Sequence, residues 1–197
     1  MGLGLAATSG AIYLYADHLE NKKKEMQKEL MKPEDYGTPS IGGPFKLIDQ
    51  NGKDFDSTVE LAGKKALLYF GFTHCPDICP EELDKLGMIC DKDPSVVPIF
   101  VTCDPRRDTP AILREYLRDF HPRIIGLTIE DGGDTEPLQS MAKAFRVYYR
   151  PARTGSDDYL LDHSIFFYFL HDGKFVKVYG KSSSVDEIVG DIANSGK

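Results

Sequence analysis

Two cysteines separated by three residues, Cys75 and Cys79, lie in the segment that most constrains how this chain can fold. The apolar run 66–72 before them is typical of a buried strand, and the pattern from Glu81 onward is typical of a helix. A short turn must therefore join strand and helix, and it can bring both thiols to one point. If Pro80 is the first helical residue, Cys79 is the N-cap, and the helix dipole favours its thiolate. Such a pair either exchanges disulfides or binds a soft metal.

The chain from Ile41 onward alternates between strand and helix patterns after an initial hairpin, which the Asn51-Gly52 pair indicates. This order predicts an α/β domain over residues 41–197, with a mixed, largely parallel sheet covered on both faces and a thioredoxin-like arrangement. Sites in such sheets lie beyond the carboxyl ends of the strands, where both thiols are expected. Strands are expected at 65–72, 96–103, 124–129, 164–170 and 175–179, and helices at 80–91, 109–120, 135–147 and 184–193.

Residues 1–16 carry no charge, although a membrane-spanning helix needs about 20 apolar residues. We interpret this run as a partial transmembrane anchor whose start lies upstream. A signal-peptide core and a short apolar helix or tail are the alternatives. Residues 17–40 are rich in charge and are broken by prolines and a glycine near their end, which is typical of a solvated stalk or linker.

The charge and the cysteine count exclude two classes of protein. A formal net charge of −7 and a pI of about 5.2 argue against general nucleic-acid binding, which needs a basic surface. Four cysteines in 197 residues are too few for a fold held together by disulfides. The thiols are therefore better explained as redox-active or metal-binding groups than as parts of a structural disulfide framework.

His163 is the third candidate for the site, because it follows an acidic loop and directly precedes an expected strand. In thioredoxin-like folds this loop faces the active-site turn. Two thiolates and one imidazole suit Cu(I), and Asp162 could orient the imidazole. The alternatives are an acid–base partner to a thiol, and a histidine that anchors the loop by hydrogen bonds.

Four motifs in this order resemble the Sco family of membrane-anchored copper chaperones in cytochrome c oxidase assembly. They are GFTHCPDICP at 71–80, DPRRDTP at 104–110, FRVYY at 145–149 and DYLLDHS at 158–164. The segment Gly42 to Phe45 and the apolar, then lysine-rich, N-terminus are also similar to that family. The resemblance covers roughly residues 41–193, and a CxxxC motif alone would be a weak signal.

The resemblance implies that Cys75, Cys79 and His163 bind copper and that the two thiols can also close a redox disulfide. It further implies delivery of copper to the CuA centre of cytochrome c oxidase subunit 2, after receipt from an upstream donor protein. Eukaryotic members lie in the mitochondrial inner membrane and face the intermembrane space. On this interpretation the chain is a metallochaperone rather than an enzyme, with an accessory thiol–disulfide reductase activity.

Other functions remain open from the residues alone. A thiol–disulfide oxidoreductase or peroxidase of the same fold is the main alternative, although dedicated oxidoreductases use two intervening residues rather than three. A redox or copper sensor and a zinc site with an open position are further alternatives.

The remaining candidates have simpler interpretations. Cys90 and Cys103 are expected to be core thiols. His74 is expected to point to solvent, with a direct role as the alternative, and His18, His121 and His171 are expected at the surface. Helix capping and a turn explain the loop 104–108 at the same sheet edge, and a docking surface for a partner is the alternative hypothesis.

Overall fold

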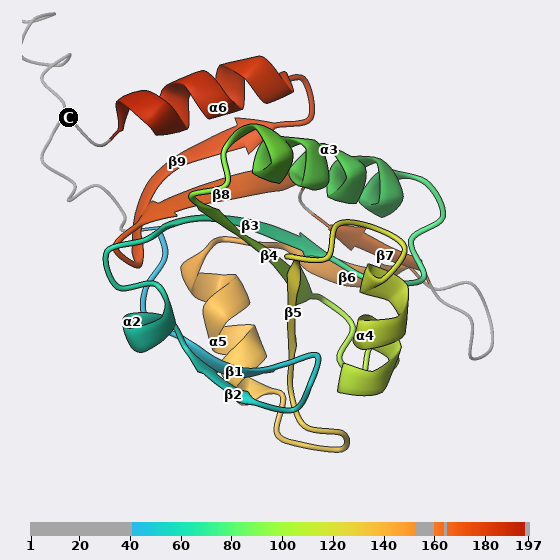
Figure 1. Ribbon diagram of the computed structural model, residues 1–197. Helices are drawn as coiled ribbons and strands as arrows, with labels where there is room; N and C mark the ends of the chain where they lie inside the picture. Colours follow the sequence, from blue (N-terminus) through green and yellow to red (C-terminus); the bar gives the residue numbers. More distant parts are fainter. Residues whose placement is uncertain (1–40, 153–159, 164, 196–197) are drawn as a thin grey trace, which may run out of the picture. The chain divides into compact units, whose positions relative to one another are not determined.

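The computed structural model describes residues 41–152, 160–163 and 165–195, and Figure 1 shows how their elements are arranged. Seven strands form one sheet in the order β2-β1-β5-β4-β3-β8-β9, and β6 and β7 form a separate ribbon. The strands are β1 Lys46–Asp49, β2 Asp54–Asp56, β3 Lys65–Gly71, β4 Val96–Thr102, β5 Ile125–Thr128, β6 Tyr149–Ala152, β7 Leu160–His163, β8 Phe166–His171 and β9 Lys174–Gly180.

The centre of the sheet is parallel and its margins are antiparallel. Strand β4 runs parallel to both β3 and β5, whereas β1 is antiparallel to β5 and β8 is antiparallel to β3. The carboxyl ends of β3, β4 and β5 therefore meet at one edge of the sheet. This mixed sheet and its N-terminal hairpin confirm the predicted thioredoxin-like class. The expectation of a largely parallel sheet is wrong, because among the described strands of this sheet only β3–β4 and β4–β5 pair in parallel.

Helices cover both faces of the sheet (Figure 1). Helices α3, α4 and α6 pack against one face, and α5 packs against the other. The helices are α2 Ser57–Glu60, α3 Ile78–Lys92, α4 Pro110–Leu117, α5 Glu136–Ala144 and α6 Val185–Asn194.

Strand β3 is the rigid base from which the cysteine turn starts. Alternate side chains of a strand point to opposite faces, and in β3 both sets are buried. Leu68 and Phe70 belong to the core on the α5 side, and Leu67 and Tyr69 to the core beneath α3, α4 and α6. Burial of each such side chain contributes about 1.5–3 kcal/mol. The strand end at Gly71 is therefore held firmly in place.

The start of α3 differs from the prediction. The helix begins at Ile78 with Asp77 as its N-cap, so Cys79 is the second helical residue rather than the cap. Pro80 is third. A proline is tolerated there because the first four backbone N–H groups of a helix have no partner within the helix. The position of the proline therefore marked the first turn but not its first residue.

Helix α5 also ends earlier than expected, at Ala144 instead of near residue 147. Arg146 adopts a φ of 57°, in the left-handed region where a helix cannot continue. The Val147 N–H then donates to the Ala142 carbonyl at 2.8 Å and closes the helix end. Glycine is the usual residue at this position, so the arginine gave no sequence signal for the stop.

The ribbon of β6 and β7 was not predicted, because the segment before His163 was interpreted as an acidic loop. Its register pairs Tyr149 with His163 and Ala152 with Leu160.

The expected anchor at 1–16 and stalk at 17–40 lie outside the described residues and remain predictions, as does the domain boundary at residue 41. Among the described residues, no helix combines the length and the apolar character needed to cross a membrane.

Candidate metal centre

The turn between β3 and α3 brings the two thiols together, as the spacing predicted. The Cys75 N–H donates to the Phe72 carbonyl at 3.2 Å, which closes the turn directly after β3. The Cys79 N–H, in the first turn of α3, donates to the Cys75 Sγ at 3.4 Å. Cys75 is partly exposed, whereas Cys79 is fully buried. A ligand from solvent therefore meets Cys75 first.

Cys79 occupies a closely packed pocket under the turn. The Tyr69 hydroxyl donates to its Sγ at 3.6 Å. A Cβ at Gly71 would lie 2.8 Å from the same sulfur and 2.8 Å from Cε2 of Phe100. Only glycine at position 71 leaves room for this thiol, which no sequence pattern indicated.

The electrostatics of Cys79 contradict the expected stabilisation of its thiolate by the helix. A hydrogen bond with Cys75 and burial both raise the pKa of the Cys79 thiol, and the weaker opposing effects include the Tyr69 hydroxyl. Two adjacent thiolates in a buried place repel each other and lack solvent. A soft monovalent cation would remove this cost, and its binding would release the thiol protons. The pair therefore fits Cu(I) chemically.

A buried carboxylate fixes the first residue of the turn. Asp108 is fully buried and accepts from the Thr73 N–H at 3.1 Å, the Thr73 hydroxyl at 2.6 Å and the Thr102 hydroxyl at 2.6 Å. We call these three residues the polar lock. Burial raises the pKa of Asp108, and the hydrogen bonds from Thr102 and Thr73 oppose that rise. The lock ties the cysteine turn to the end of β4.

The sequence analysis explained the loop 104–108 by a turn and helix capping, with a docking surface as the alternative, and missed the polar lock. The turn and the cap are present, because the Asp108 N–H donates to the Asp104 carbonyl and Thr109 caps α4. Asp104 is only 3% exposed, and it forms an ion pair with Arg107. Together with the burial of Asp108, this makes both aspartates internal, so the docking hypothesis is wrong for them. Only the DPRRDTP motif hinted at their role, and it does not reveal which side chains point inward.

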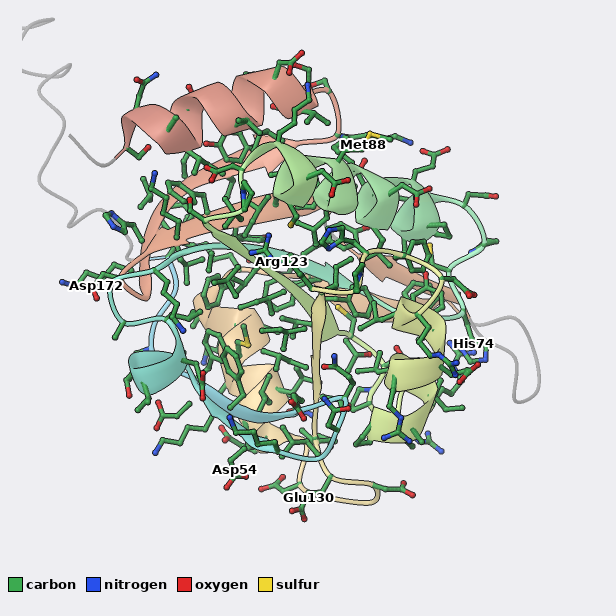
Figure 2. The ribbon with its side chains drawn as sticks, in the orientation of Figure 1. Asp54, His74, Met88, Arg123, Glu130 and Asp172 are labelled. Atoms are coloured by element: carbon green, nitrogen blue, oxygen red, sulfur yellow. The ribbon has the colours of Figure 1, made fainter. Side chains whose placement is uncertain are left out.

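His74 contacts the polar lock and directly precedes Cys75 in the sequence. Its Nδ1 lies 3.0 Å from the Thr73 Oγ1 and 4.0 Å from Oδ1 of Asp108. Its side chain is 51% exposed, and Figure 2 shows it at the outer margin of the fold. The expected exposure is confirmed.

For His163 the structure describes only the backbone, which ends β7 opposite Tyr149. Its side chain lies outside the described part, as do residues 157 and 158 of the acidic loop. Among the described side chains, no group of three or more His, Cys, Asp and Glu residues could hold a metal ion.

The other cysteines and histidines follow the simpler interpretations. Cys90 and Cys103 are buried, and the four cysteines, all of them described, form no disulfide. His121 is the exception to the expected surface role, because its side chain is only 16% exposed and its Nε2 lies 3.4 Å from Asp91. His18 lies outside the described residues.

Fold and turn together define a thioredoxin-like protein with a CxxxC thiol pair at the edge of its sheet. The SCO1/SenC family matches residues 33–196, and the chain belongs to this family.

Two relatives illustrate the similarity. Protein sco1 of Schizosaccharomyces pombe is 43% identical over 93% of this chain and 71% of its own length. The human protein SCO1 homolog, mitochondrial, is 37% identical over 95% of this chain and 63% of its own length. The chain thus spans about two thirds of the length of these relatives.

Solved structures with bound copper also resemble this chain. Arabidopsis thaliana ScoI with copper bound matches with a TM-score of 0.70 and 45% identity, over 79% of this chain and 97% of that one. Yeast Sco1 with copper bound matches with a TM-score of 0.70 and 44% identity, over 80% of this chain and 88% of that one. These matches agree with the predicted resemblance.

Proposed function

We propose that this protein is a copper metallochaperone in which Cys75, Cys79 and His163 bind copper. The observation that carries the proposal is the contact between the two cysteines, with the Cys75 Sγ 3.4 Å from the Cys79 amide on one rigid turn. Soft thiolates favour Cu(I), and a site with few ligands releases the ion by ligand exchange. The copper-bound structures of the Arabidopsis and yeast relatives support this choice of metal.

The topology supports His163 as the third ligand. Strand β8 is antiparallel to β3 and pairs Phe167 with Tyr69, so the start of β8 lies beside the end of β3. His163 precedes β8 by only two residues. Its backbone, at the end of β7, thus lies close in sequence to the start of β8, which borders the end of β3 where the cysteine turn begins.

The target of delivery is the CuA centre of cytochrome c oxidase subunit 2, with an upstream protein as the copper donor. Membership of the Sco family supports this target. Relatives named as mitochondrial proteins support a mitochondrial location. We place the domain in the intermembrane space, held by the inner membrane.

A second activity, thiol–disulfide exchange, rests on the closeness of the same two cysteines, where the Cys79 N–H donates to the Cys75 Sγ at 3.4 Å. Closing them into a disulfide would remove both copper ligands, so copper loading and oxidation would exclude each other. The reduced pair could return two electrons to a disulfide of the acceptor and become oxidised itself. We propose this as an accessory role.

A transfer experiment tests the main proposal. Copper-loaded chain is mixed with the reduced, metal-free copper domain of cytochrome c oxidase subunit 2, and the CuA absorption of the acceptor is followed. Loaded wild type is expected to generate this absorption, and Cys75→Ala and Cys79→Ala are expected to fail. Cys90→Ala is the matched control, because Cys90 is a buried core thiol.

Two results would contradict the proposal. One is a wild-type chain that retains its copper in the presence of the acceptor. The other is rapid catalytic turnover of a disulfide or peroxide substrate without copper binding, which would favour the oxidoreductase.

A further inference from the structure

Asp108 joins three segments at the edge of the sheet where the cysteine turn begins. Its carboxylate accepts from the Thr73 N–H at 3.1 Å, the Thr73 hydroxyl at 2.6 Å and the Thr102 hydroxyl at 2.6 Å. Its backbone carbonyl accepts from the Thr128 hydroxyl at 2.8 Å. Thr102 and Thr128 are the last residues of β4 and β5, so these two contacts anchor Asp108 in the parallel centre of the sheet. The contacts with Thr73 extend this anchor to the cysteine turn.

Thr73 in turn determines where Cys75 lies. The Cys75 N–H donates to the Phe72 carbonyl at 3.2 Å, which closes a four-residue turn with Thr73 as its second residue. The two bonds to Asp108 hold both the backbone and the side chain of that residue. Cys75 is the fourth residue of the turn, and its Sγ accepts from the Cys79 N–H at 3.4 Å. A short path of hydrogen bonds thus leads from Asp108 to the thiol pair.

The burial of this anchor makes it resistant to displacement. Asp108 and Thr102 are both fully buried, so water does not replace a donor that leaves the carboxylate. A buried acceptor that loses its donor keeps the cost of its desolvation without the compensating bond. Moving Thr73 away from Asp108 is therefore unfavourable. The partly exposed Cys75 thus takes its position from a buried group in a distant loop.

We propose that Asp108 is a positioning residue, which holds the turn of residues 72–75 in the shape that keeps the Cys75 and Cys79 thiols side by side. This inference rests on the proposed copper-binding function and deepens it. Groups that are already in place lose little freedom when they close on one ion or on each other, and such preorganisation strengthens binding. Without the hydroxyl contact of Thr73, the turn must be ordered each time the pair closes. Asp108 therefore raises the effective concentration of one thiol at the other.

The first test measures this effective concentration without copper, from the equilibrium of the reduced protein with glutathione disulfide. One protein thiolate attacks a glutathione sulfur and releases a glutathione thiolate, and the second protein thiolate then displaces the other glutathione. The protein loses two electrons and two protons, and the two glutathione molecules take them up. The equilibrium constant of this exchange is the effective concentration of the Cys75–Cys79 pair.

Three variants separate positioning from stability. Thr73→Val keeps the shape of the side chain without its hydroxyl, and it should lower the effective concentration about tenfold, because one turn residue must be reordered when the pair closes. Thr73→Ser restores the hydroxyl and should behave as wild type. Thr128→Val is the matched control, because its lost hydrogen bond goes to the Asp108 backbone rather than to the turn. It should lose a similar amount of stability in urea unfolding and keep the wild-type effective concentration.

The second test measures the Cu(I) affinity of the same variants by competition with bicinchoninate. Thr73→Val is expected to bind Cu(I) about tenfold more weakly, whereas Thr128→Val is expected to match wild type. His74→Ala separates the Asp108 contact from the neighbouring imidazole, whose Nδ1 lies 3.0 Å from the same Thr73 hydroxyl. It should leave both measurements unchanged.

The outcomes separate this inference from the proposed function. An effective concentration that is unchanged in Thr73→Val, or lowered equally in Thr128→Val, would overturn the positioning role, because Asp108 would then serve stability alone. A loss in His74→Ala as large as in Thr73→Val would also overturn it, since the effect would belong to the histidine contact. A wild-type chain that binds no Cu(I) would refute the proposed function, and the glutathione equilibrium would still decide whether Asp108 positions the pair.

Discussion

Replacing Gly71 with alanine adds a methyl group to the pocket that holds the thiol of Cys79. The new Cβ would lie 2.8 Å from the Cys79 Sγ, 2.8 Å from Cε2 of Phe100 and 3.1 Å from Cε1 of Tyr69. Real Cβ atoms essentially never approach neighbours closer than 3.0 Å, so something must shift. All three neighbours are fully buried, so none can move out into solvent.

Overpacking of this kind costs about 1–3 kcal/mol in the free energy of unfolding. For a domain of this size, each kcal/mol lowers the melting temperature by about 2–4 °C. Copper affinity should fall as well, because the sulfur that must move is a proposed ligand. Urea unfolding of the metal-free protein measures the first effect, and competition with a Cu(I) chelator measures the second.

Gly180→Ala is the matched control, because the new Cβ on β9 would meet only Phe166, at an ordinary 3.8 Å. We expect a smaller change in stability and no change in copper affinity. If Gly71→Ala were as stable and bound copper as tightly as this control, the tight pocket around Cys79 would be refuted.

Three further predictions concern the lock, the thiol and the acid range. Thr102→Val removes one hydroxyl of the polar lock and should cost about 1–3 kcal/mol in urea unfolding; no loss would contradict the lock. Tyr69→Phe should raise the pKa of Cys79 further and shift the pH dependence of Cys79 alkylation to higher pH, because the Tyr69 hydroxyl lowers that pKa. An unchanged pH dependence would show that the hydroxyl does not lower it. Hydrogen bonding to Lys46 lowers the pKa of Asp56 from 3.8 to about 2, so its stabilising effect is present above pH 3.8 and lost as the pH falls through about 2. Asp56→Asn should therefore flatten the acid end of the stability curve, and an identical curve would argue against the interaction.

Local patterns were enough to predict the strand, turn and helix around Cys75 and Cys79. The strand is a continuous apolar run, and the spacing of the cysteines fits a single turn. The helix start was misplaced by two residues, because a proline fits anywhere in a first turn. Such errors arise where several positions satisfy the same local rule.

The environment of the thiols could not be predicted, because it depends on contacts between distant segments. Thr73 and Asp108 are 35 residues apart in sequence, and only the pairing of β3 with β4 brings their loops together. The raised pKa of Cys79 likewise follows from the hydrogen bond with Cys75 and from burial under the packed helices, which together override the favourable helix end. His163 was selected from its position and from family resemblance, and its role remains a prediction.

The central claim is that Cys75, Cys79 and His163 together hold copper. The most direct measurement is X-ray absorption on the chain loaded with Cu(I), with metal analysis, for wild type and for Cys75→Ala, Cys79→Ala and His163→Ala. We expect one copper per chain, with two sulfur neighbours and one nitrogen neighbour in wild type. Each cysteine variant should lose a sulfur neighbour, and His163→Ala should lose the nitrogen. Wild type without copper, or His163→Ala with an unchanged spectrum, would contradict the account.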